Sequence, residues 1–333
     1  MFEKVGEFVA GAQNRFDLWQ QRVPVVAFPI SVWLRYREDR CYEYAALLSY
    51  YGFFSIFPLL TVGVTIIGFL LNDNPTLRDE LLDSVFAQIP VIGDALAREI
   101  GGLEGNGVVL LVAVGFTLWA GIGVVRVAQD AFNTMWSVSI MRWPSFFPKL
   151  LRALGALVII GGAFLVATIV SAIATFAFDL PGAERLAGVV VAVIVNSLML
   201  LLVFKVLTVS HVGWRSLMPG ALIGGIAMWV LQLLGGIYIN GVILGASNVY
   251  GAFATALGLL VWLALVARIV LLAAEVNVVA QKHLWPRSFE GKNLTEADER
   301  SFEEVRTRSI RKPLPDERGD ESGDPGEDPT MTP

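Results

Sequence analysis

The sequence has little of what disulfide-bonded proteins, metalloproteins and most enzymes need. Its single cysteine, Cys41, excludes a disulfide bond within the chain, and two histidines leave little for a metal site. No Walker A, G-x-S-x-G or H-E-x-x-H motif is present. A nuclease would need metal-binding acids or a basic surface, and the acidic residues here lie mainly in one loop and the tail. We therefore expect no enzymatic activity, no cofactor, no metal and no nucleic-acid partner.

Charge is also scarce. Charged residues make up 17% of the chain and apolar residues 55%, and the mean hydropathy is +0.62. These values are typical of a polytopic membrane protein rather than a soluble globule. The charge is unevenly divided: residues 287–333 hold eight basic and thirteen acidic groups, residues 72–106 hold two and seven, and the remainder holds fifteen and ten. The membrane-embedded part of the chain is therefore its basic part.

Long uncharged runs predict the fold class. Residues 43–71 carry no charge after Glu43, and this run is longer than the roughly 20 residues that cross a bilayer as an α-helix. We expect an all-α, polytopic membrane protein with about six transmembrane helices in a membrane domain of residues 43–282. The expected spans are residues 43–71, 107–130, 151–178, 186–207, 219–239 and 251–274.

Basic residues set the expected orientation. Arg35, Arg37 and Arg40 precede the first span, and the positive-inside rule places them in the cytoplasm. With six spans, both chain termini are then cytoplasmic. We interpret the three arginines as a topology signal, with contact to anionic lipid head groups as a second possibility. Residues 1–42 predict two amphipathic segments, separated near Pro24, that lie at the membrane interface.

The expected periplasmic loop, residues 72–106, carries an amphipathic helical stripe whose polar face is acidic. An acidic face repels anionic lipids, so we expect this segment to cap the outer mouth of the bundle. It either closes the bundle as a structural lid or acts as a substrate gate.

The C-terminal tail, residues 283–333, is rich in charge, proline and glycine. Such a composition predicts a largely disordered cytoplasmic segment. Within it, the run LTEADERSFEEVRTRSIR predicts a short helix with Thr295 as its N-cap.

The first span carries a polar stripe. Tyr51, Ser55 and Pro58 follow Tyr44 at helical spacing, and Pro58 predicts a kink unless neighbouring helices compensate for its lost hydrogen bond. The stripe either packs against other helices or lines a polar cavity.

Four ionisable residues fall near the predicted cytoplasmic ends of two spans. Arg126 and Asp130 are four residues apart and can pair on one helix face, although Arg126 can instead reach lipid phosphates. Arg268 and Glu275 share a face of the last span. Ionisable residues at such depth indicate a functional site, and we hypothesise that the four form one ionic cluster.

The fifth span is rich in glycine. We expect it to open at Pro219 and either to approach a neighbouring helix closely or to bend, and the sequence does not separate these uses. Asn196 in the fourth span predicts an interhelical hydrogen bond, and Gln232 in the fifth needs a partner. The glycines concerned are Gly220, Gly224, Gly225, Gly235 and Gly236.

The string AALLSYYGFFSIFPLL at the first span resembles the signature of the YihY/BrkB family of bacterial inner-membrane proteins. The resemblance continues over most of residues 35–282, with a Trp-rich second span, an Arg-x-x-x-Pro-Gly start to the fifth span and a Tyr-Gly-x-Phe start to the sixth. It implies a six-span protein of the inner membrane, linked to envelope integrity or serum resistance. An older assignment of the family as a ribonuclease is not supported by these residues.

Two functions remain open. One is transport or translocation of a lipid or an anionic solute in support of envelope integrity, which without an ATP-binding motif would be passive, ion-coupled or driven by a partner. The other is a non-transporting scaffold or regulator of envelope assembly. Membrane lipids are expected partners in both, and a homo-oligomer or an envelope-protein partner is compatible with either. Charge kept inside spans favours transport.

Overall fold

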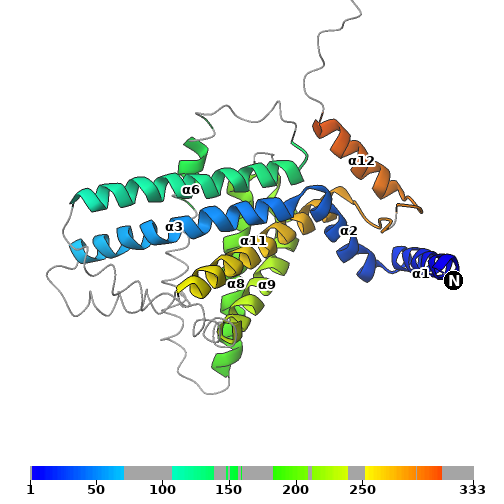
Figure 1. The fold of residues 1–333 in the computed structure, drawn as a ribbon, viewed down its shortest axis with the longest axis horizontal. Helices are drawn as coiled ribbons and strands as arrows, with labels where there is room; N and C mark the ends of the chain where they lie inside the picture. The colour runs from blue at the N-terminus through cyan, green and yellow to red at the C-terminus, as the bar shows by residue number, and fades with distance from the viewer. Residues whose placement is uncertain are drawn as a thin grey trace, which may run out of the picture.

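The computed structural model is all-helical in the part of the chain that it describes (Figure 1). It describes residues 2–70, 107–138, 148, 151–156, 159, 183–208, 212–238, 252–289 and 291–309, and these ranges contain no strand. The helices are α1 Phe2–Arg22, α2 Pro24–Glu38, α3 Cys41–Leu70, α6 Gly107–Met135, α8 Ala183–Leu207, α9 Trp214–Tyr238, α11 Ala252–Lys282 and α12 Glu296–Ser309.

Long apolar helices confirm a polytopic membrane protein. Within the described ranges, three segments are long and apolar enough to cross a bilayer: Leu186–Leu207, Trp214–Gly235 and Ala256–Lys282. The helices α3 and α6 match the first two expected spans in position. The expected periplasmic loop and most of the third expected span lie outside the described residues.

The long helices pack in neighbouring pairs around α11. The helix α3 lies along α6, α8 packs against α9, and α11 contacts both α3 and α9 (Figure 1). The most deeply buried apolar side chains include Phe132, Phe204 and Leu271, and the Phe132 and Phe204 rings meet edge to face at 5.7 Å. These residues lie in the halves of α6, α8 and α11 nearest to α2. We call this end of the bundle, which the positive-inside rule assigns to the cytoplasm, the inner end.

Glycines let α9 approach both of its neighbours. The Gly220 N–H donates a hydrogen bond to Asn277 Oδ1 on α11 at 2.7 Å, and a Cβ at this position would collide with the Ala273 carbonyl oxygen. A Cβ on Gly225 would collide with Ser197 of α8. Similar close approaches occur at Gly224 and Gly235. The surroundings of Gly236 lie outside the described residues.

Two polar side chains predicted to need partners bond to each other. The Asn196 amide on α8 donates to Gln232 Oε1 on α9 at 3.3 Å, which confirms both expectations. The expected start of the fifth span differs: α9 begins at Trp214, and Pro219 lies inside it. A proline this close to a helix N-terminus removes only one backbone hydrogen bond, so the helix can begin earlier than the proline indicates.

The N-terminal segments are two helices that meet at Val23, as predicted from Pro24. The tail was expected to be largely disordered apart from one short helix, but residues 285–289 and 291–309 fold beside α1 and α2, and residues 310–333 lie outside the described residues. Composition predicted a solvated segment, but side chains of this segment are paired with partners far away in the sequence. The predicted helix and its cap are confirmed, because Thr295 Oγ1 accepts the Asp298 N–H while Asp298 Oδ2 accepts the Thr295 N–H.

The glycine contacts generate a stability prediction. Gly220→Ala should lower the free energy of unfolding by about 1–3 kcal/mol, because the new methyl group meets a backbone carbonyl that cannot rotate away. Gly188→Ala on α8 is the matched control, because a Cβ there meets nothing within 4 Å. Thermal unfolding in detergent should show a lower melting temperature for Gly220→Ala alone, and equal melting of the two variants would contradict the packing described.

Candidate functional site

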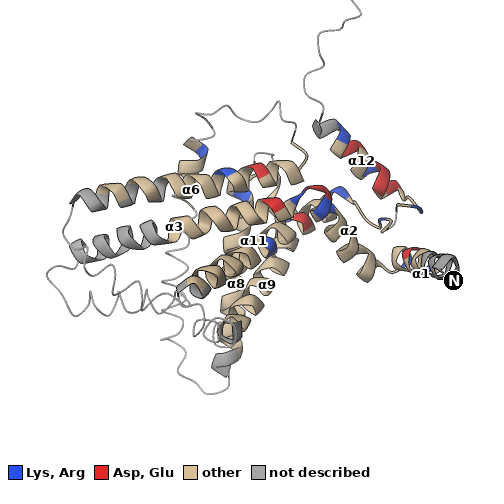
Figure 2. Cartoon of the chain, in the orientation of Figure 1, with Lys and Arg blue, Asp and Glu red and all other residues tan. Residues whose placement is uncertain are grey.

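Charged residues gather at the inner end, where α2, α3 and α11 meet (Figure 2), and side chains of α12 reach the same point. Several of these charged residues are buried. We define the inner cluster as the ionisable side chains that meet there around one guanidinium group. Its members are Arg35, Asp39, Cys41, Glu275, Lys282 and Glu304. The sequence places them on four elements, so only the tertiary fold brings them together.

Arg35 occupies the centre of the inner cluster and is fully buried. Its Nε lies 3.0 Å from Asp39 Oδ2, one helical turn later on α2. Its terminal nitrogens donate to Ser301 Oγ on α12 at 2.8 Å, to Ser137 Oγ after α6 at 2.9 Å and to Glu304 Oε2 at 3.2 Å. One side chain thus joins α2, α6 and α12. Burial lowers the Arg35 pKa, but Asp39, Glu275, Glu304 and Glu38 together outweigh it, so the pKa is raised and Arg35 remains a cation.

Glu275 brings α11 into the inner cluster. Its side chain is completely buried, and Oε1 accepts a hydrogen bond from the Cys41 thiol at 3.3 Å. Its carboxyl group is also in hydrogen-bonding contact with that of Asp39. The contacts that hold Glu275 therefore come from the end of α2 and the beginning of α3.

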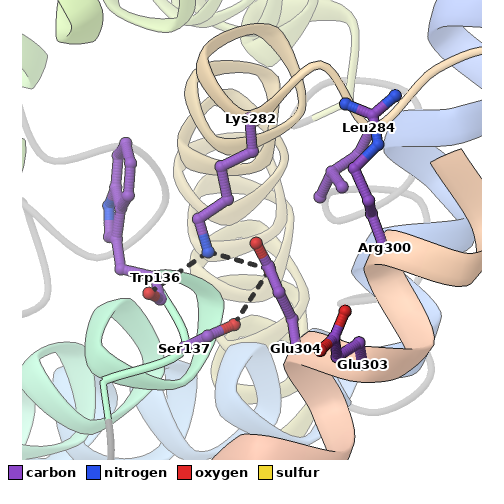
Figure 3. A pocket seen from close by; sticks show the side chains of 7 residues that line it. All are labelled: Trp136, Ser137, Lys282, Leu284, Arg300, Glu303 and Glu304. Carbon is purple, nitrogen blue, oxygen red and sulfur yellow. Dashed lines mark hydrogen bonds and ion pairs between the residues drawn. The ribbon is translucent and has the colours of Figure 1, made fainter.

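Lys282 and Glu304 connect the inner cluster to a polar pocket. Lys282 Nζ donates to Glu304 Oε2 at 2.8 Å and to the Trp136 carbonyl oxygen at 3.3 Å (Figure 3). The pocket has a volume of about 420 Å³ and lies between the ends of α6 and α11 and the side of α12. Arg300 and Glu303 line it as well. It carries groups of both signs at the predicted cytoplasmic surface.

A second buried arginine fixes α12 to the N-terminal helices. Arg287 makes a bidentate ion pair with Glu38, at 2.6 and 2.7 Å, and its Nε lies 2.9 Å from Asp298 Oδ1. Burial lowers its pKa, but these carboxylates outweigh burial and raise it. Ser301 Oγ donates to Glu38 at 3.1 Å and also accepts from Arg35, so the two arginine sites form one network.

Asp17 ties α1 to the segment between α11 and α12. It accepts hydrogen bonds from the Phe289 N–H at 2.8 Å and from the hydroxyl of Ser288 at 2.9 Å, and it also bonds Asn293 and Gln20. Burial raises the Asp17 pKa, but these donors together outweigh burial and leave the pKa below its ordinary value. We call α1, α2, residues 283–289 and residues 291–309 the cap, because these segments are joined at the inner end.

The predicted ionic residues fall in the same half of the molecule. Arg126 and Asp130 are partly buried on α6 and both have polar partners. Arg268 is exposed on α11 and acts on Tyr36 of α2, whose pKa is raised to about 12, chiefly by burial and by Cys41, against the opposing effect of Arg268. That Arg126, Asp130, Arg268 and Glu275 form one ionic cluster stays a prediction, because the contacts described for Glu275 are to α2 and α3.

The polar stripe of the first span is placed on α3. The Tyr51 ring lies against Gly123 of α6 and edge-on to Trp119 at 6.3 Å. Ser55 Oγ donates to the Gly52 carbonyl oxygen at 2.8 Å. The helix continues through Pro58, whose side-chain surroundings lie outside the described residues. A polar cavity along this stripe stays a prediction.

Sequence reasoning missed most of the inner cluster and the cap. Arg35 was interpreted as a topology signal, Arg287 was placed in a largely disordered tail, and Asp298 and Glu304 were placed in its short helix without partners. Asp39 follows Arg35 by four residues on one helix, which is a spacing for pairing. That signal was available in the sequence, but it does not reveal burial.

Removing Arg287 should detach α12. Arg287→Ala leaves the buried Asp298 and the partly buried Glu38 without their cation, which costs about 3–5 kcal/mol. Amide hydrogen exchange should then rise sharply in residues 296–309. Arg300→Ala is the matched control, because Arg300 makes an exposed pair with Glu296 that is worth about 0–1 kcal/mol. Equal exchange in the two variants would contradict the network.

The Asp17 site predicts a dependence on pH. Because the folded pKa is lowered, the stabilisation by Asp17 is complete above the ordinary value of 3.8 and disappears as the pH falls through the lower folded value. Protection of the Phe289 amide, measured by hydrogen exchange, should therefore persist from pH 7 to pH 5. Asp17→Asn should reduce it at pH 7 by about 1.5–3 kcal/mol, the usual value of hydrogen bonds to a charged group. Unchanged protection in Asp17→Asn would refute this role.

Comparison with known proteins gives a family and no solved structure. The family model described as Virulence factor BrkB matches residues 32–297. No solved structure matches the chain. The match includes the second half of α2 from Val32, the long helices, the inner cluster apart from Glu304, and Arg287.

The curated relatives are membrane proteins. A UPF0761 membrane protein of Stenotrophomonas maltophilia is 26% identical over 283 residues, which cover 79% of this chain and 64% of the relative. The inner membrane protein YhjD of Escherichia coli is 24% identical over 287 residues, which cover 80% of this chain and 85% of YhjD. The chain thus spans less than two thirds of the Stenotrophomonas relative. With its apolar helices and a family match over most of its length, the chain is an integral protein of the bacterial inner membrane and belongs to the BrkB (YihY/BrkB) family.

Proposed function

We propose that this protein is a transporter, and not an enzyme, that moves a lipid or an anionic solute across the inner membrane. In this proposal the inner cluster closes the cytoplasmic end of the pathway. The observation that carries the proposal is the complete burial of Glu275 and Arg35, two ionisable side chains, at the inner end of a largely apolar bundle.

Energetics support a switching role for these charges. Buried ion pairs contribute little net stability, because desolvation offsets their attraction, and apolar side chains of similar size often hold a fold as well. Ionisable groups near membrane depth are costly and commonly mark transport pathways. A guanidinium that joins α2, α6 and α12 can release all three when its partners change, which is the behaviour expected of a gate.

The chemistry of the pocket supports an anionic substrate. Lys282 has three N–H donors, and two of them face Trp136 and Glu304. A phosphate or carboxylate can accept the third and also reach Arg300, which lines the same pocket. The volume of about 420 Å³ exceeds that of a few water molecules and suits a lipid head group.

A scaffold is the second candidate, and the cap favours it. Arg287, Glu38 and Asp298 hold α12 in a fixed position beside α2. The outward side of α12 exposes acidic groups and Phe302. A fixed helix of this kind can recruit a partner without any transport through the bundle.

Reconstituted flux separates these functions. Proteoliposomes should translocate fluorescent phosphatidylglycerol or an anionic lipid-linked precursor faster than protein-free vesicles. Glu275→Gln and Arg126→Gln, each checked for folding by thermal unfolding, should lose flux by roughly tenfold or more, because an interaction of about 1.5–3 kcal/mol with a charged group is removed. Glu43→Gln is the matched control, because Glu43 makes an exposed pair with Arg40.

Wild-type flux that survives in folded Glu275→Gln would reject the role of the inner cluster, and flux that survives in folded Arg126→Gln would place the pathway away from Arg126. No flux above protein-free vesicles for any of these lipids would favour the scaffold. Normal envelope integrity in cells that express folded Glu275→Gln, with a defect in cells that express Arg287→Ala, would point to the same conclusion.

A further inference from the structure

The inner cluster holds more acid than base. Three carboxyl groups, on Asp39, Glu275 and Glu304, meet two cations, Arg35 and Lys282. Asp39 and Glu275 are at most 1% exposed, whereas the Glu304 side chain is 27% exposed. Fully ionised, the group would carry one excess negative charge at its buried side. An uncompensated charge in that position is strongly unfavourable.

Geometry locates the excess at Asp39 and Glu275. The Nε of Arg35 faces Asp39, and its terminal nitrogens face Ser301, Ser137 and Glu304. Glu275 Oε1 accepts from the Cys41 thiol, a weak donor. Glu275 Oε2 is buried and accepts no hydrogen bond from any donor group among the described residues. The neighbour in hydrogen-bonding contact with this carboxyl is the carboxyl of Asp39.

Two ionised carboxylates cannot hydrogen-bond to each other, because both are acceptors only. Close carboxyl pairs therefore retain one proton between them. We infer that Asp39 and Glu275 share one proton when the inner end is closed, and that this pair is the site at which proton binding is coupled to transport. The second half of this inference rests on the proposed function, and the first half does not.

The surrounding groups are compatible with a proton at this pair. On α2, Tyr36 is buried and near Glu275, and on α3 the group that faces the pair is Cys41. On α11 the further charges are Arg268 and Lys282, and on α12 the nearest is Glu304, which Lys282 and Arg35 neutralise. Glu38 and Asp298 are paired with Arg287. None of these pairings supplies a second cation directly to Asp39 and Glu275.

A proton fits the pair better than a metal ion. Sodium-like or divalent cations take about six oxygen ligands, whereas this site offers two carboxyl groups, a thiol and an adjacent guanidinium that repels cations. The described residues contain no group of three or more His, Cys, Asp or Glu side chains placed to hold a metal.

The shared proton determines how pH affects the opening and closing of the inner end. When water reaches the pair from the side of Glu304, the carboxyl O–H bond breaks and the proton moves to that water. Two adjacent carboxylates then lie side by side next to Arg35, and their repulsion opposes closure. The closed state binds one proton more than the open state, so a lower cytoplasmic pH favours closure and a higher pH favours opening.

Infrared spectroscopy of the full-length protein in lipid vesicles tests the shared proton directly. At neutral pH the wild type should show the C=O stretching band of a buried protonated carboxylic acid, with a downshift in D₂O. Glu275→Gln should lose this band, because Asp39 then lies beside Arg35 without a second carboxyl group in contact with it. Glu304→Gln and Glu43→Gln are the matched controls and should keep it.

The wild-type spectrum tests the shared proton even if a variant does not fold. Absence of the carboxylic-acid band from that spectrum at neutral pH overturns the inference. Loss of the band in Glu304→Gln with retention in Glu275→Gln also overturns it. Flux is measured separately in the same vesicles, with and without a pH gradient. The band without flux supports the shared proton and rejects the proposed function, whereas flux that does not respond to the gradient rejects the coupling alone.

Discussion

The buried guanidinium of Arg35 is the interaction on which the inner end depends. It joins its own helix α2 to the end of α6 through Ser137 and to α12 through Ser301 and Glu304. A buried cation needs several acceptors to offset desolvation, so each element that supplies one is fixed in place. The second arginine, Arg287, joins α2 to α12 in the same way, through Glu38 and Asp298. Together they make the cap part of the fold rather than an appendage.

Backbone packing sets the position of Glu275 in the inner cluster. The Gly220 N–H on α9 bonds to Asn277, two residues beyond Glu275 on α11. Only a glycine allows α9 to come close enough to the Ala273 carbonyl for that bond. The close approach of two apolar helices therefore positions an acidic side chain. The glycines of α9 and the charges of α2 act on the same helix, α11, from opposite sides.

Patterns of neighbouring residues in the sequence predicted the structural features that depend on short-range interactions. Uncharged runs predicted the spans. Pro24 predicted the break between α1 and α2, and Thr295 was predicted as the N-cap residue of α12. Asn196 and Gln232 were each expected to need a partner, because an amide in an apolar helix must be satisfied. The inner cluster was not predictable in this way. Arg35 and Glu304 are 269 residues apart, and Arg287 and Glu38 are 249 apart, so neither pairing leaves a periodic signal.

The same physics explains why residues 285–289 and 291–309 fold against the N-terminal helices although their charge composition predicted a solvated tail. A segment rich in charge is solvated when its charges have only water as a partner. Here Glu38 and Asp17 on the N-terminal helices supply partners of matching geometry, and folding exchanges hydration for hydrogen bonds of comparable strength. The net gain of such an exchange is small, so a change of one protonation state or one ligand can reverse it. A cap held by buried polar groups is therefore suited to open and close, which an equally large apolar interface would resist.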